Sequence, residues 1–106
     1  KLDAPSGTAL MIADEIKKEL DETPEYVYDR HSVRKKRDKN EIGLHSVRGG
    51  NIVGEHTVIF AGNDEIVEIT HKAASKEIFA LGSIKAAKFL SGKSAGLYNM
   101  QDIMNM

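Results

Sequence analysis

The first eight residues bring together groups that bind anions. The segment begins at Lys1 and continues through Ser6, Gly7 and Thr8 into an apolar pattern typical of a helix. Backbone N–H groups in the first turn of a helix have no partner within the helix and carry the positive end of its dipole. Gly7 leaves room for an anion and Lys1 adds a full charge, so this is a candidate carboxylate or phosphate site. The alternative is that Ser6 caps the helix and nothing more.

Histidines form the second candidate. A tight turn at residues 62–64 would bring Glu55 near His71, and His56 near Thr70, on neighbouring strands. A carboxylate and two imidazoles can hold a metal ion, but consecutive residues of a strand, such as Glu55 and His56, point to opposite faces. We therefore expect no metal site, and we expect the strand histidines to be satisfied by hydrogen bonds. The full set is His31, His45, His56 and His71.

A basic run is the third candidate, with the sequence Arg34-Lys35-Lys36-Arg37-Asp38-Lys39. Such a run can form a phosphate or nucleic-acid patch. However, no aromatic residue is interleaved with it, and the net charge of the chain is −1. We therefore expect a solvated loop and no nucleic-acid partner. The basic run is part of a longer polar stretch, Arg30 to Glu41, to which we assign no function.

The composition is that of a soluble globular domain. Of the 106 residues, 41% are hydrophobic and 29% are charged, and one domain of this length can bury a real core. The absence of cysteine excludes a disulfide scaffold, a thiolate zinc site and a cysteine nucleophile, and it fits a reducing compartment. No apolar run approaches the about 20 residues of a membrane span, and no signal peptide is apparent. Because the chain begins at Lys1 rather than at a methionine, we expect it to be part of a longer protein.

The elements that must position these residues follow from local patterns. Apolar residues recur at helical spacing from Ala9 to Leu20, and Ser75 and Gly92 mark the start and the stop of a second helix. Runs of β-branched and aromatic residues alternate with glycine-containing turns, which favours strands joined as an antiparallel meander. The expected helices cover Thr8–Leu20 and Lys76–Ser91, and a short turn covers Met100–Met104. The expected strands cover Glu25–Asp29, Ile42–Arg48, Asn51 or Ile52 to Ala61, and Glu65–Lys72.

The predicted fold class is α+β, with a mixed or antiparallel sheet of about four strands (a β-meander) and two main helices on one face. The second helix is apolar around most of its circumference, so we expect it to be buried on more than one side. Both faces of the strands also carry apolar residues, with Val58 and Phe60 on one and Ile59 on the other, which favours a sheet covered on both sides. Two helices do not suffice for that, so we expect the other face to be used in oligomer assembly.

Several segments resemble motifs of one enzyme family. Lys1-Leu-Asp-Ala-Pro-Ser-Gly-Thr-Ala9 resembles the signature of the dihydrodipicolinate reductase family. The stretch Arg48-Gly-Gly-Asn-Ile-Val-Gly-Glu-His-Thr-Val-Ile-Phe-Ala-Gly62 is similar to the family's central strand motif. Further similarity lies in Glu68-Ile-Thr-His-Lys-Ala-Ala-Ser75, Phe79-Ala-Leu-Gly82, Ala86-Ala87 and Gly96-Leu-Tyr-Asn-Met100. On these motifs the chain is identified as a member of the family over essentially its whole length.

The resemblance implies more than composition and spacing can. The family reduces 4-hydroxy-tetrahydrodipicolinate to tetrahydrodipicolinate in the diaminopimelate route to lysine, in the cytoplasm, with NADPH or NADH. An N-terminal Rossmann domain binds the cofactor, and a C-terminal domain, matching residues 1–106, binds the dicarboxylate substrate and forms a homotetramer through its sheet. Lys1 matches the lysine taken as the proton donor. The expected substrate-binding residues are Ser6, Gly7 and Thr8, of which Gly7 and Thr8 match the residues that bind a substrate carboxylate.

The chain also departs from the family pattern. The paired histidines that precede the family's lysine are absent, and Lys76 stands where arginine is more usual. The resemblance places the Rossmann domain outside residues 1–106, so the cofactor-binding residues are unknown. The alternative function is a non-catalytic assembly domain that tetramerises and keeps a residual anion site. In either interpretation we expect this chain alone to be inactive as a reductase, because it lacks a dinucleotide site.

Overall fold

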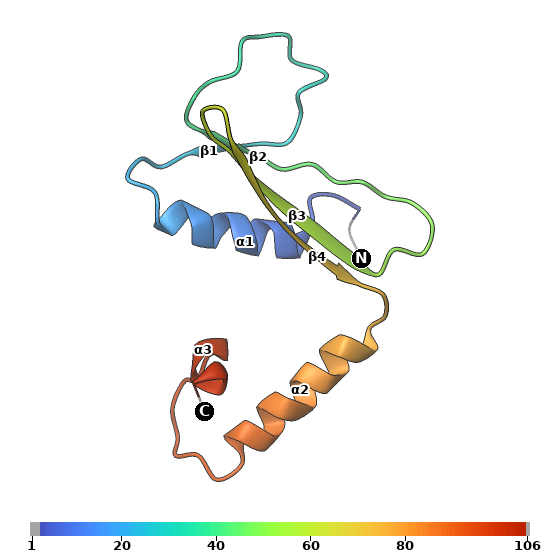
Figure 1. Cartoon of the computed structure of the whole chain (residues 1–106), viewed down its shortest axis with the longest axis vertical. Coiled ribbons are helices and arrows are strands. Elements are labelled where there is room, and N and C mark those ends of the chain that lie inside the picture. Colours follow the sequence, from blue (N-terminus) through green and yellow to red (C-terminus); the bar gives the residue numbers. More distant parts are fainter. Residues whose placement is uncertain (1–2, 106) are drawn as a thin grey trace. The chain divides into compact units, whose positions relative to one another are not determined.

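The computed structural model describes residues 3–105. The chain forms two compact units, Lys1–Asn51 and Ile52–Met106, and helices and strands occur in both (Figure 1). The α+β class is therefore confirmed. Over the described residues the strands form two sheets of two strands each, rather than one sheet of about four. No helix in the same range is long and apolar enough to cross a membrane.

The first unit contains one helix and two short strands. After α1 (Gly7–Lys18) come β1 (Glu25–Val27) and β2 (Glu41–Gly43), which pair in parallel. The helix contacts β1 through Tyr26, whose hydroxyl donates a 2.5 Å hydrogen bond to Asp14 Oδ1. Parallel pairing needs a connection of about a dozen residues or more to bring the chain back in the same direction. Residues 28–40 make that connection as a long open loop (Figure 1).

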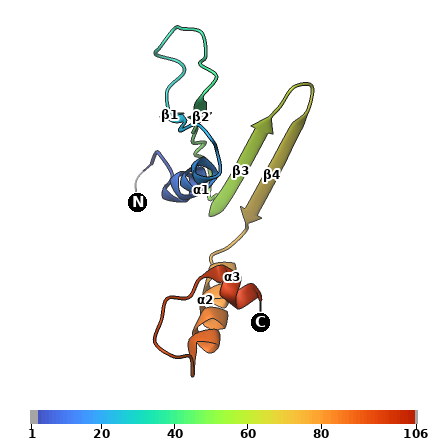
Figure 2. The same ribbon diagram turned by 90° about the vertical axis from the view of Figure 1, so that its left-hand side faces the viewer.

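The second unit begins with an antiparallel hairpin of β3 (Gly54–Ala61) and β4 (Ile66–Ala73), drawn as two long arrows in Figure 2. The predicted turn joins them. The Gly62 N–H donates to the Glu65 carbonyl at 2.8 Å, and Asp64 has a positive φ of 60°. Asparagine and aspartate tolerate this left-handed conformation better than most residues, which explains the turn sequence.

Two helices follow the hairpin, α2 (Glu77–Leu90) and α3 (Met100–Met104). The predicted stop signal of α2 is confirmed, because Gly92 has a φ of 82° just after the helix. Ser75 lies one residue outside the cap, and its hydroxyl accepts the N–H of Glu77 at 3.2 Å. Asn99 caps α3 in a reciprocal pair with Asp102, as its side chain accepts one backbone N–H and the aspartate accepts the other.

The strand predicted over Ile42–Arg48 is wrong in its length and in its partner. Only Glu41–Gly43 forms a strand, and it pairs with β1 rather than with β3. The pairing ends where the Leu44 N–H donates to the Val27 carbonyl at 2.9 Å, because β1 itself ends at Val27. Residues 44–53 form no strand, so the meander is reduced to the β3–β4 hairpin.

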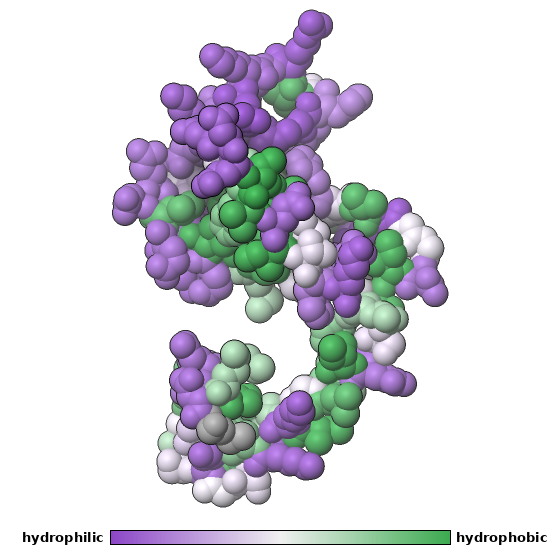
Figure 3. All heavy atoms as spheres, viewed as in Figure 1, coloured by the Kyte–Doolittle hydropathy of each residue, from purple (hydrophilic) through white to green (hydrophobic). Residues whose placement is uncertain are grey.

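Few apolar side chains are buried in the described part of the single chain, and the second helix is not buried on more than one side. Phe89 is the buried residue of α2, whereas Phe79 is 51% and Ile84 53% exposed. Figure 3 shows hydrophobic residues at the surface of α2 and hydrophilic ones gathered over the 28–40 loop. That the two main helices share one sheet face stays a prediction. The buried apolar residues are Ala13, Leu44, Ala73 and Phe89.

Candidate functional site

Ser6 builds the start of α1. It has the extended backbone of a helix cap, with φ −68° and ψ 131°, and its Oγ accepts a 3.3 Å hydrogen bond from the Ala9 N–H. The Ser6 carbonyl accepts the Leu10 N–H at 3.1 Å, so helical hydrogen bonding begins at this residue. The capping role predicted for Ser6 is confirmed, and the cap fixes the direction of the N–H groups that follow it.

Gly7 and Thr8 are the first helical residues, and both are exposed. Their N–H groups have no acceptor among the described residues, as is normal for a first turn. A Cβ added at Gly7 would meet nothing within 4 Å, so the space beside these groups is open. The first turn has no acidic residue and the last turn has Lys17 and Lys18, so no helix side chain neutralises the positive end of the dipole. This geometry suits a carboxylate or another oxyanion.

Lys1, the predicted proton donor, lies outside the described residues. The segment that precedes α1 is held by an ion pair from a distant part of the sequence, with 3.6 Å between Arg48 Nε and Asp3 Oδ1. The Asp3 side chain is 87% exposed, so the pair contributes little stability. It nevertheless places a guanidinium beside the loop that leads into Ser6. Arg48 is not among the site residues predicted from the sequence, although its place before Gly49-Gly50 in a family motif was a signal.

Two of the four histidines, His56 and His71, lie on the β3–β4 hairpin, and His31 and His45 lie outside helices and strands. In the part of the chain that the structure describes, no group of three or more His, Asp or Glu side chains is placed to hold a metal ion. The hairpin register also differs by one residue from the expectation. Glu55 lies opposite Lys72, and His56 lies opposite His71, because the connection spans residues 62–65. Glu55 and Lys72 form an ion pair of 3.6 Å.

The basic run lies in the 28–40 loop, which is exposed from residue 28 to residue 40 and contains no helix or strand. The loop is therefore exposed to solvent, as predicted. An ion pair nevertheless joins the two ends of the loop, with 2.7 Å between Arg30 and Glu41. No local pattern in the sequence predicts this pair.

The family model described as "Dihydrodipicolinate reductase, C-terminus" matches residues 1–104 of the chain. The chain belongs to this family. The resemblance drawn from the sequence motifs is thereby confirmed, and the helix start at Ser6, Gly7 and Thr8 lies inside the matched region.

Curated relatives of this family member are named 4-hydroxy-tetrahydrodipicolinate reductase. A protein of Caldanaerobacter subterraneus subsp. tengcongensis is 59% identical over 104 residues, which is 98% of this chain and 41% of the relative. One of Clostridium tetani is 55% identical over 99% of this chain and 41% of its own length. One of Brachyspira hyodysenteriae is 53% identical over 98% of this chain and 45% of its own length. The chain thus spans about two-fifths of the relatives that it matches.

Proposed function

We propose that the protein containing this chain reduces 4-hydroxy-tetrahydrodipicolinate to tetrahydrodipicolinate with NADPH or NADH, and that this chain supplies the substrate-binding half. The reaction would serve the diaminopimelate route to lysine in the cytoplasm. The observation that carries the proposal is the chain-long similarity to reductases of that name. The open helix start at Gly7 and Thr8 supports it, because the substrate is a dicarboxylate.

The reaction removes the substrate hydroxyl as water and then adds a hydride and a proton across the resulting double bond. The nicotinamide supplies the hydride when it is bound. The described residues do not fit a dinucleotide, because the parallel strands β1 and β2 are joined by an open loop rather than by a glycine-rich turn and a helix. We therefore assign the cofactor to the part of the protein that lies beyond this chain.

Each site residue has a distinct task in this proposal. The N–H groups of Gly7 and Thr8 hold one substrate carboxylate, which fixes the ring for the incoming hydride. Ser6 acts by positioning, because its bond to the Ala9 N–H sets the direction of the turn. Lys1 donates the proton that hydride addition requires, since an ammonium next to the bound anion is a suitable general acid.

Two variants of the full-length protein separate binding from proton transfer. Gly7→Ala places a methyl group where the carboxylate would lie, while the free helix has room for it. We expect KM for the substrate to rise about tenfold or more, with weaker binding of dipicolinate and an unchanged thermal unfolding midpoint. Lys1→Ala should lower kcat by about 100-fold or more and leave dipicolinate binding nearly unchanged.

Other results would contradict these assignments. Normal turnover by Lys1→Ala would remove the lysine from the mechanism, and unchanged KM in Gly7→Ala would remove the helix start. We also propose that the isolated chain has no reductase activity. Cofactor-dependent reduction by the chain alone would overturn that statement and the assignment of the cofactor to the rest of the protein.

We further propose that the chain assembles as a homotetramer through its β3–β4 hairpin. The hairpin carries exposed apolar residues on both faces, with Val67 55% and Ile69 61% exposed on one and Ile66 63% exposed on the other. Apolar surface of this kind is typical of an interface. The same observation favours the second candidate function, a non-catalytic assembly domain, for the chain taken alone.

Sedimentation velocity tests the assembly. Ile69→Glu and Thr70→Glu place a charge at neighbouring positions that point to opposite faces of β4, so the variant that dissociates the protein marks the face in contact. Lys36→Glu, which changes a charge in the exposed loop, is the control and should leave the assembly intact. If both hairpin variants remain tetrameric, or if the unmodified protein is a monomer, the hairpin is not the interface.

A further inference from the structure

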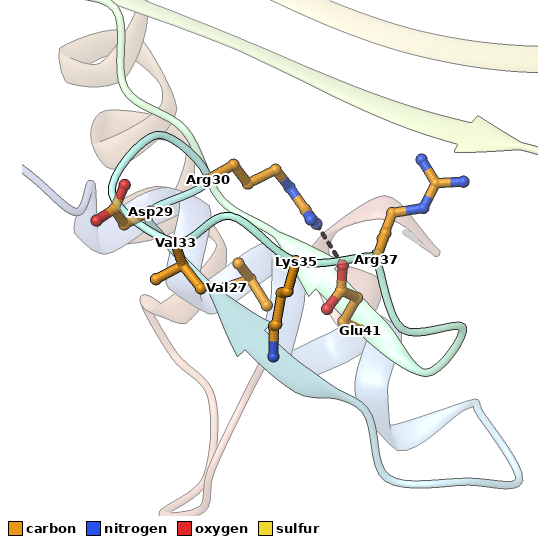
Figure 4. A pocket seen from close by; sticks show the side chains of 7 residues that line it. All are labelled: Val27, Asp29, Arg30, Val33, Lys35, Arg37 and Glu41. Carbon is orange, nitrogen blue, oxygen red and sulfur yellow. Dashed lines mark ion pairs between the residues drawn. The ribbon is translucent and has the colours of Figure 1, made fainter.

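The long connection between β1 and β2 borders a cavity of about 340 Å³ in the first unit, and this cavity is open to solvent. Figure 4 shows Arg30 reaching to Glu41, while the Lys35 and Arg37 side chains leave the other part of the loop in different directions. The volume of the cavity lies at the lower end of the range for small-molecule pockets, about 300–1,000 Å³. The cavity is therefore large enough for a small ion or a single small molecule.

Positive charge is concentrated in this loop. Six of the residues from Arg30 to Glu41 are lysine or arginine and two are acidic, whereas the whole chain has a net charge of −1. Three of the cations, Arg30, Lys35 and Arg37, line the cavity. The lining also includes two carboxylates, Asp29 and Glu41. The cavity attracts anions only if other groups of the protein already compensate these two negative charges.

Asp29 is turned toward the backbone. Its Oδ1 accepts the N–H of His31 at 2.9 Å and the N–H of Ser32 at 3.0 Å, which shapes the entry to the loop. These bonds, chiefly that from Ser32, hold the pKa of Asp29 below its ordinary value, so the carboxylate is ionised and already satisfied. The negative charge of Asp29 is thus compensated by N–H groups at the start of the loop.

Glu41 is compensated by Arg30. The two side chains form an ion pair of 2.7 Å, and only 7% of the Glu41 side chain is exposed, against 38% for Arg30. Glu41 therefore anchors the guanidinium at the wall of the cavity while part of it stays accessible. A fixed arginine loses less conformational entropy when an anion binds than a free one does.

The remaining cations have weak partners or none. Arg37 forms no ion pair within residues 3–105, and Lys35 is paired only with Asp38, at 3.6 Å. The Lys35 and Asp38 side chains are 65% and 70% exposed, so this pair contributes little and is easily replaced. The cavity thus has one anchored arginine and two cations available for a ligand.

We propose that this loop binds a phosphate group, as the free ion or on a nucleotide. A phosphate carries nearly two negative charges and several acceptor oxygens, which suits a cavity lined by two arginines and a lysine once the exposed Lys35 and Arg37 side chains turn toward it. A carboxylate, with a single negative charge, would leave one of the two available cations unpaired. Binding of nucleic acid is disfavoured because the cations surround one cavity and no aromatic side chain lines it. The inference goes beyond the proposed reduction and does not depend on it.

Hydrogen exchange of the loop in the full-length protein tests the proposal, because this readout is blind to phosphate bound elsewhere. Inorganic phosphate should slow exchange in the peptide that spans residues 29–41, and chloride at the same ionic strength should not. Arg37→Ala should raise the phosphate concentration needed for half-protection about tenfold or more. Arg34→Ala removes the same charge from the same loop but does not line the cavity, so it should change that concentration less than twofold.

The comparison of the two variants decides the outcome. Equal weakening by Arg34→Ala and Arg37→Ala would show diffuse attraction to a basic loop and would overturn the site, as would the absence of protection by phosphate. Adenosine monophosphate serves as the second probe. Protection at lower concentration than inorganic phosphate assigns the site to a nucleotide phosphate, and protection at equal or higher concentration assigns it to the free ion.

Discussion

Arg30 Nη2 lies 2.7 Å from Glu41 Oε1, and 93% of the Glu41 side chain is removed from solvent. The guanidinium N–H groups do not point along this contact, so Oε1 accepts no hydrogen bond from the described residues. The pair therefore depends on charge in surroundings that screen it poorly. Since Arg30 follows β1 and Glu41 begins β2, the pair closes the base of the 28–40 loop.

Removing Arg30 should destabilise the protein more than neutralising its partner does. Arg30→Ala leaves a nearly buried carboxylate without a counter-charge, and we expect the free energy of unfolding to fall by about 1–3 kcal/mol. Glu41→Gln leaves a partly exposed guanidinium that water can solvate, so the loss should be smaller. Denaturant unfolding measures both. Lys35→Ala, which breaks only an exposed pair, is the control, and a greater loss for Glu41→Gln than for Arg30→Ala would contradict the explanation.

Gly43→Ala should disturb the Arg30–Glu41 ion pair, because the added methyl group would crowd the Arg30 guanidinium. An added Cβ would lie 3.2 Å from both Arg30 Nη2 and His45 Nε2, so these side-chain ends must move. We expect a loss of about 1 kcal/mol in the free energy of unfolding, because the displaced groups are the ends of side chains and not backbone. Gly49→Ala meets nothing within 4 Å and should be nearly neutral.

A double-mutant cycle gives this prediction its decisive test. In the Arg30→Ala background the penalty of Gly43→Ala should shrink, because one of the two groups that crowd the methyl is gone. An equal penalty in both backgrounds would mean that the substitution acts through the backbone or through His45 instead.

The Tyr26 phenol should ionise at unusually high pH. Its hydrogen bond to Asp14, together with reduced hydration and the repulsion between phenolate and carboxylate, raises the pKa of Tyr26 to about 12. Because this folded-state pKa lies above the ordinary value of 10.0, the contact stabilises the fold fully below about pH 10. That contribution disappears as the pH rises through about 12.

Ultraviolet titration of the phenolate measures this pKa. Tyr26→Phe should remove the highest of the tyrosine steps, which assigns that step to Tyr26. Asp14→Asn should return the step toward the ordinary range, since the amide oxygen accepts a weaker bond and carries no charge. A highest step that survives in Tyr26→Phe would belong to another tyrosine and would refute the assignment.

Local signals predicted several parts of the fold and the first part of the site. Ser6 and Gly92 each act at a helix end through neighbouring residues, and the Gly62-Asn63-Asp64 turn joins neighbouring strands. The helix start with its open N–H groups was predictable for the same reason. The strand over Ile42–Arg48 was not, because its pattern is equally compatible with pairing to β1 or to β3.

The sequence by itself determined where helices and the hairpin form, that a helix begins at Gly7 behind a Ser6 cap, and to which family the chain belongs. Only the tertiary structure decided the parallel pairing of β1 with β2, the Arg30–Glu41 pair and the contact of Asp3 with Arg48. Caps and tight turns are closed by residues adjacent in the sequence, so the free energy that stabilises them depends on those few residues. Pairings across a long loop depend on closing that loop and on which partner is available, and no local pattern contains that information.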